Sequence, residues 1–231
     1  VLINPNNPCG SVCGPDDIDA LLAIARDFPN CIVVADEIYD GLDFTGEQVS
    51  VASRSTDVPV IALNGVSKVY YAPGWRIGYM ALHDPQRRLT LVRDGLERLL
   101  RSRLCASTPA QMGYLAGLEG DRGWMEVYAQ RVQQQRDHCL RRIQGIDGLE
   151  VEHPGGAFYM FIRLTDERWA ADDKAFVLDL LHEEHVLLVH GSGFSPDLGK
   201  GHVRLVYLAD VSVLDEVFDR IDRFLKKHRQ G

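Results

Sequence analysis

Three predicted strands of this 231-residue chain are each followed directly by side chains that can do chemistry. The polar stretches are residues 4–10 (NPNNPCG), 36–39 (DEIY) and 64–68 (NGVSK), and Arg76 comes eight residues after Lys68. In open α/β sheets, ligands bind outside the carboxyl ends of the strands. The spacing therefore predicts that an asparagine, an aspartate, a tyrosine, a lysine and an arginine meet at one rim of a sheet.

These side chains suit a cofactor that carries both an aldehyde and a phosphate. The amine of Lys68, the only lysine among the first 173 residues, can form a Schiff base with an aldehyde. A carboxylate such as Asp36 can keep a pyridine nitrogen protonated, so that the ring accepts electrons. The phenol of Tyr39 and the amide of Asn7 can hydrogen-bond a ring oxygen, and the guanidinium of Arg76 can grip a phosphate with two hydrogen bonds. Pyridoxal 5'-phosphate (PLP) needs a set of this kind.

The elements that must position this rim alternate between strands and helices. The predicted strands of the first half are residues 1–3, 31–35, 58–63 and 76–82. Helices are predicted to begin at Pro15, followed by two acidic residues that suit the helix dipole, and at Pro85. The apolar side chains of the second helix recur at helical spacing: Leu89, Val92, Leu96, Leu99 and Leu100. This alternation predicts βαβ units and a parallel sheet.

After two further predicted helices, near residues 109–118 and 123–144, the pattern changes. The order becomes strand, strand, helix, strand, strand, helix, over residues 149–152, 157–163, 172–183, 186–189, 202–208 and 211–227. This order predicts a separate, smaller α+β unit. We place the boundary near residue 130, inside the long helix.

Four motifs, in order and spacing, resemble the class I/II aminotransferases of PLP fold type I: NPNNPCG, DEIY, SKVYYAPGWRIGY and a late VRL. The resemblance covers essentially the whole chain and matches the C-terminal part of the family. Four longer segments are similar to alanine aminotransferases of the archaeal and enteric type: RLCASTPAQ, GGAFYMF, EHVLLVHGSGF and GHVRLVYL. The implied fold class is α/β, with residues 1–130 as part of the large PLP-binding domain (a mostly parallel sheet with helices) and residues 131–231 as a small α+β C-terminal domain.

The resemblance also implies a role for each matching residue. Lys68 would be the Schiff-base lysine and Asp36 the partner of the pyridinium nitrogen. Tyr39 and Asn7 would bind the ring oxygen, and Arg76 would bind the phosphate.

On the predicted smaller unit, Arg204 would bind the α-carboxylate of the amino acid, and Gly156 would allow the substrate to approach closely. Two positions depart from the family pattern. Cys9 stands where the family usually has threonine, and Gly65 stands where many members have a phosphate-binding serine. At Gly65 only the backbone could contact the phosphate.

The activity implied is transfer of an amino group between alanine and 2-oxoglutarate, by a protein that is a homodimer at full length. Two alternatives share the cofactor residues: a lyase or cyclase of the same fold, or the PLP-fold ligand-binding module of a transcription regulator. The chain opens on Val1 within an apolar strand pattern, which predicts a fragment. We therefore expect these residues alone to have little or no transaminase activity.

Composition excludes several other classes. A formal net charge of −8 argues against a nucleic-acid surface, and no apolar run approaches the length of about 18 residues that suggests a membrane span. The five cysteines are irregularly spaced, so they predict neither a disulfide framework nor a zinc site. Because cysteines stay reduced in the cytoplasm, we expect a cytoplasmic protein. His182 and His185 lie three residues apart rather than four, so they do not form a zinc-protease motif, and no metal site is predicted.

Overall fold

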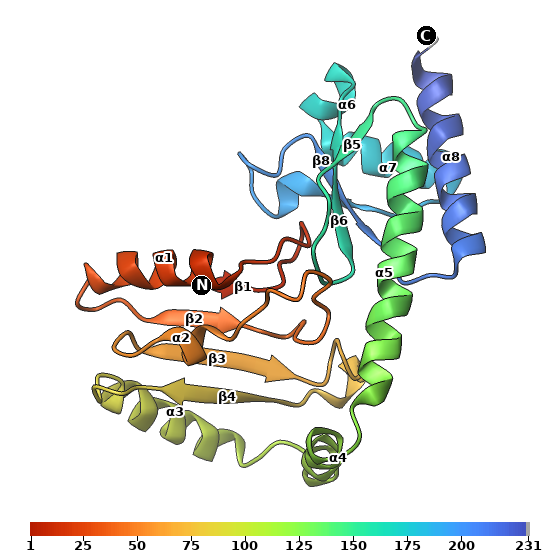
Figure 1. Ribbon diagram of the computed structural model, residues 1–231. Coiled ribbons are helices and arrows are strands. Elements are labelled where there is room, and N and C mark those ends of the chain that lie inside the picture. Colours follow the sequence, from red (N-terminus) through yellow and green to blue (C-terminus); the bar gives the residue numbers. More distant parts are fainter. Residues whose placement is uncertain (230–231) are drawn as a thin grey trace. The chain divides into compact units, whose positions relative to one another are not determined.

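The structure is a computed structural model that describes residues 1–229 (Figure 1). The chain forms two compact units. The first comprises Val1–Pro5 and Val12–Val127, and the second comprises Asn6–Ser11 and Tyr128–Gly231. The last two residues of the predicted C-terminal domain lie outside the described residues. The sequence patterns did not predict that the short segment Asn6–Ser11 packs with the second unit.

The first unit is built on a four-stranded sheet in the order β1-β2-β3-β4, with strands β1 (Leu2–Ile3), β2 (Val33–Asp36), β3 (Val60–Gly65) and β4 (Gly78–His83). Strands β1, β2 and β3 are parallel, as predicted, but β4 pairs with β3 in the antiparallel sense. For two consecutive strands to pair in parallel, the connection between them must cross back over the sheet, usually through a helix. The connection from β3 to β4 contains only the short 3₁₀ helix η1 (Pro73–Trp75), so the strand direction reverses.

Helix α1 (Pro15–Arg26) covers the first part of this sheet (Figure 1). It begins with proline in its first turn, and the carboxylate of Asp17 accepts the N–H of Gly14 at 3.1 Å. Its buried residues Ile18 and Leu22 pack in one cluster with strand residues of β2 and β3 and with the short helix α2 (Val51–Arg54). Burial of each such aliphatic side chain stabilises the fold by about 1.5–3 kcal/mol.

The second predicted helix begins later than its proline suggested. Helix α3 (Thr90–Arg103) is preceded by a turn in which the carboxylate of Asp84 accepts the N–H groups of Arg88 and Leu89 at 2.8 and 2.7 Å. Of the predicted apolar face, Leu89 is buried, whereas Leu99 and Leu100 are 68% and 64% exposed. Helices α4 (Thr108–Glu119) and α5 (Gly123–Gln144) follow.

The second unit contains an antiparallel sheet in the order β5-β6-β8-β7, with strands β5 (Leu149–Val151), β6 (Tyr159–Leu164), β7 (Val189–His190) and β8 (His202–Val206). Helices α6 (Glu167–Ala171), α7 (Asp173–Glu184) and α8 (Val211–Arg229) complete it, and η2 (Gly191–Gly193) follows β7. Side chains alternate along β6, so Met160, Ile162 and Leu164 enter the core while Phe161 and Arg163 face the other way. The predicted order of elements is found in this unit, with one further short helix, α6, that the sequence patterns did not predict.

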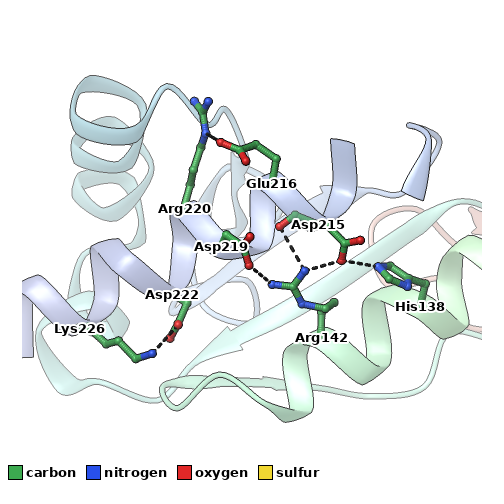
Figure 2. A network of polar contacts seen from close by, with 8 residues as sticks. All are labelled: His138, Arg142, Asp215, Glu216, Asp219, Arg220, Asp222 and Lys226. Carbon is green, nitrogen blue, oxygen red and sulfur yellow. Dashed lines mark hydrogen bonds and ion pairs between the residues drawn. The ribbon is translucent and has the colours of Figure 1, made fainter. Parts of the chain in front are cut away.

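A network of charged side chains joins α5 to α8 within the second unit (Figure 2). Arg142 on α5 pairs with Asp215 and Asp219 on α8, and His138 Nε2 lies 2.9 Å from Asp215 Oδ1. The hydrogen bond from Arg142, followed by that from His138, lowers the pKa of Asp215. The network thus holds Asp215 in its charged form over most of the pH range.

Candidate active site

Asp36 and Tyr39 lie at the carboxyl end of β2. Asp36 is the last residue of the strand, opposite Ile3 on β1 and Leu63 on β3. Its Oδ1 accepts the N–H of Ile38 at 3.2 Å, which fixes the carboxylate over the turn that follows. Tyr39 in this turn is buried. Parallel pairing places this end of β2 beside the carboxyl end of β3.

Lys68 lies half-buried in the turn after β3. The strand end is unusually crowded there, because Gly65 pairs with Gly78 of β4. A Cβ atom on Gly65 would lie 2.8 Å from the carbonyl oxygen of Ile77, and one on Gly78 would lie 2.6 Å from that of Asn64. A serine at position 65, the residue found in many family members, would therefore require the neighbouring backbone to shift.

Arg76 reaches the same edge of the sheet because β4 runs antiparallel. It precedes β4, whose first residue, Gly78, pairs with the last residue of β3. Had β4 been parallel, the start of the strand would lie at the opposite edge. Arg76 is exposed in a left-handed conformation with φ 51°, and its Nη1 donates to the carbonyl of Pro73 at 2.8 Å. The first unit thus gathers Asp36, Tyr39, Lys68 and Arg76 at one edge.

Asn7 and Arg204 meet within the second unit, although 197 residues separate them in the sequence. Arg204 on β8 donates from Nη1 to Asn7 Oδ1 at 2.8 Å. Its guanidinium carbon lies 4.6 Å from the ring centre of Tyr159 and 4.9 Å from that of Phe194. Its Nε is buried and has no hydrogen-bond partner among the described residues. A guanidinium held in this way, with a donor left unsatisfied, suits a carboxylate.

Gly156 lies in the loop before β6 and donates its N–H to the carbonyl of Gly10 at 2.8 Å. Gly10 has φ +71°, and a Cβ atom there would lie 2.7 Å from Pro154 Cβ and 2.8 Å from the carbonyl oxygen of Tyr159. The two loops therefore touch closely, which only glycine at position 10 permits. The role predicted for Gly156 toward substrate stays a prediction.

The sequence model of the family described as "Aminotransferase class I and II" matches residues 1–221. The chain belongs to the class I and II aminotransferases. The glutamate-pyruvate aminotransferase AlaA of Haemophilus influenzae is 38% identical over 100% of this chain and 57% of its own length. The alanine aminotransferase of Mycobacterium tuberculosis (strain H37Rv) is 34% identical, over 100% of this chain and 54% of its own length. The chain thus spans little more than half the length of these curated relatives.

A solved aminotransferase structure supports the same assignment. The alanine aminotransferase from Pyrococcus furiosus superposes with a TM-score of 0.93 at 43% sequence identity, over 98% of this chain and 57% of its own. The predicted resemblance to class I/II aminotransferases and the predicted fold class are confirmed. That the chain corresponds to the C-terminal part of the family stays a prediction.

Two aromatic residues of the candidate site escaped the sequence analysis: Tyr159 and Phe194, whose rings lie close to the guanidinium of Arg204. Tyr159 begins β6, opposite Val206, and Phe194 follows η2. The alternation along β6 could have placed Tyr159 on the same face as Arg204. No local pattern marks Phe194, because its contact depends on the fold of a loop.

A second group of aromatic residues lies in the first unit. Tyr70, in the turn after Lys68, packs edge-on against Tyr114 at 5.6 Å and against Trp124 at 5.5 Å. Tyr79 of β4 stacks on Tyr114 at 6.0 Å. Burial raises the pKa of Tyr114 to about 12, so this phenol stays neutral at physiological pH. These contacts support the turn that carries Lys68.

Among the described residues, no group of histidine, cysteine or acidic side chains could hold a metal ion. No helix in the same part of the chain is long and apolar enough to span a membrane.

Proposed function

We propose that the full-length protein containing this chain transfers an amino group between alanine and 2-oxoglutarate, with PLP as its cofactor. The observation that carries the proposal is Arg204, a guanidinium oriented by Asn7 and two aromatic rings that keeps a buried donor unsatisfied. The names of the relatives, glutamate-pyruvate and alanine aminotransferase, support the choice of substrates.

The donor set of the first unit fits PLP. We assign the amine of Lys68 to the aldehyde, the carboxylate of Asp36 to the ring nitrogen, the phenol of Tyr39 to the ring oxygen and the guanidinium of Arg76 to the phosphate. The amide of Asn7 would also bind the ring oxygen. Because Gly65 has no hydroxyl, we expect Arg76 to carry more of the phosphate binding than in members that have a serine at this position.

Each residue then has a defined task in the reaction. When bound, PLP supplies an electron sink that stabilises negative charge at the α-carbon of the amino acid. Asp36 holds the proton on the ring nitrogen, which keeps that sink effective. Nζ of Lys68 would take the proton from the α-carbon as general base and then deliver it, as general acid, to the carbon of PLP that carries the aldehyde. Arg204 binds the α-carboxylate with two hydrogen bonds and so orients the amino acid.

The test is a ping-pong assay of the purified full-length protein with alanine and 2-oxoglutarate. Initial rates at several fixed concentrations of the second substrate should give parallel double-reciprocal lines, with pyruvate and glutamate as products. Intersecting lines, or elimination products without glutamate, would instead support the lyase or cyclase alternative. Binding of PLP without turnover of any amino acid would support the regulator module.

We also propose that the full-length protein is a homodimer. Apolar side chains on α3 and α4 and between them are widely exposed in this chain, among them Leu91 (84%) on α3, Leu104 (86%) just after α3 and Met112 (61%) on α4. Large exposed apolar patches mark surfaces that another chain or segment covers. The molar mass of the full-length protein, measured by light scattering, distinguishes a dimer from a monomer. The cytoplasmic location expected from the cysteines stays a prediction.

A further inference from the structure

The loop formed by residues 154–157, between β5 and β6, contains a residue in an uncommon conformation. Ala157 has φ +57° and is completely buried. A residue with a side chain adopts this left-handed conformation at a cost in free energy, which favourable contacts of the surrounding structure offset. We therefore expect contacts from neighbouring elements to hold the loop.

Two buried polar side chains hold the two ends of this loop. Arg136 on α5 is 5% exposed, and its Nη1 donates to the carbonyl of Pro154 at 2.9 Å. Tyr207, just after β8, is fully buried and donates its hydroxyl to the carbonyl of Ala157 at 3.3 Å. Burial raises the pKa of Tyr207, so the phenol remains a donor. Neither side chain has a task in the proposed chemistry.

A buried guanidinium is costly unless it is paired and hydrogen-bonded. Arg136 meets this requirement through Asp137, whose Oδ1 lies 2.7 Å from its Nη2, and through the carbonyl of Pro154. The pair with Asp137 lies on α5 itself. The bond to Pro154 is therefore a contact that ties the helix to the loop.

Two chains of contacts connect this loop to Arg204. Gly156 is bonded to Gly10, in the same short segment as Asn7, and Asn7 accepts a hydrogen bond from Arg204. Along the other route, the chain runs from Ala157 to Tyr159, whose ring lies against the guanidinium of Arg204. All of these residues belong to the second unit.

We propose that Arg136 and Tyr207 are positioning residues for the binding of the substrate carboxylate. By holding the loop at Pro154 and Ala157, they fix Asn7 and Tyr159, and these two orient the guanidinium of Arg204. The inference rests on the proposed function, because it assigns the carboxylate to Arg204. Neither positioning residue needs to touch the substrate or the cofactor.

The main test is Tyr207→Phe in the full-length, PLP-loaded protein. This change removes one hydroxyl and keeps the ring. Loss of a hydrogen bond of ordinary strength should raise the KM for alanine and for 2-oxoglutarate about two- to tenfold. The value of kcat should change less, and the visible absorbance and retention of PLP should stay as in the wild type. Arg136→Lys, which shortens the reach to Pro154, should shift KM in the same direction.

A matched control separates positioning from loss of stability. Ile221 on α8 is buried in the core of the same unit, and Ile221→Val should lower the stability without touching the loop. Its KM values should stay at the wild-type level. Amide hydrogen exchange of a peptide covering residues 154–157 gives a readout independent of activity. Exchange should be faster in Tyr207→Phe than in the wild type and unchanged in Ile221→Val.

The possible outcomes distinguish the two proposals. If Arg204→Lys raises KM but Tyr207→Phe does not, or if Ile221→Val raises KM as much as Tyr207→Phe, the positioning role is wrong and the proposed function stands. If Arg204→Lys leaves KM unchanged, the carboxylate does not bind there, and both the role assigned to Arg204 and the positioning role are wrong, whereas the proposed amino transfer fails only if the ping-pong assay shows no turnover. A rise in KM confined to the Tyr207 and Arg136 variants and to Arg204→Lys supports both.

Discussion

Replacement of Arg204 by lysine should weaken amino-acid binding far more than PLP binding. Lysine keeps the positive charge but offers a compact ammonium instead of a planar fork. It cannot pair with a carboxylate through two parallel hydrogen bonds, and it cannot lie flat between the rings of Tyr159 and Phe194, which now flank the guanidinium at 4.6 and 4.9 Å. A single ammonium would also have to choose between a hydrogen bond to Asn7 and one to the substrate carboxylate.

The expected loss of binding free energy follows from the positive charge that lysine keeps. Removing one partner of a buried charge pair costs about 2–5 kcal/mol. Because the charge is kept in Arg204→Lys, we expect the lower part of this range, about 2–3 kcal/mol. At 1.4 kcal/mol per tenfold, this corresponds to a loss of about 30- to 150-fold in kcat/KM for alanine. The dissociation constant of PLP should change less than about threefold, since no cofactor role is assigned to Arg204.

The assay compares kcat/KM for alanine and 2-oxoglutarate with the dissociation constant of PLP measured by absorbance. Arg163→Lys is the matched control, because Arg163 lies on the neighbouring strand β6, is 56% exposed and pairs with Glu150. Exposed ion pairs contribute about 0–1 kcal/mol, so this variant should behave almost as the wild type. Equal losses for substrate and cofactor in Arg204→Lys, or equal losses in both variants, would show that Arg204 has a structural role.

Three further predictions concern other parts of the chain. Lys68→Ala should abolish covalent attachment of PLP in the full-length protein; borohydride reduction and peptide mapping test this, and label on Lys174 or Lys200 would contradict it. Asp215→Asn should lower the melting temperature at pH 7; since the folded pKa of Asp215 is lowered, the difference from wild type should persist above pH ~4 and vanish as the pH falls through the folded value. The 231-residue chain expressed alone should show little or no turnover of alanine with 2-oxoglutarate, because it spans 57% of the AlaA relative from Haemophilus influenzae; a rate per site equal to that of the full-length protein would refute this.

The order of elements and the motifs at strand ends could be read from the sequence because both are local. Continuous apolar runs predict buried strands, and a proline followed by acidic residues predicts a helix start, as in α1. Lys68 stood out because the chain has so few lysines. Spacing along the chain was therefore sufficient to predict that Asp36 and Lys68 follow neighbouring strands.

Contacts between segments that are distant in the sequence could be identified only from the tertiary structure. The antiparallel direction of β4, which brings Arg76 beside the end of β3, depends on how the chain returns rather than on the composition of either strand. Similarly, no local pattern indicates that Asn7 packs with the second unit and accepts a hydrogen bond from Arg204, 197 residues away. Side-chain types and their periodicity are properties of a short segment, whereas the partner of a guanidinium is decided by which segments the whole chain packs together.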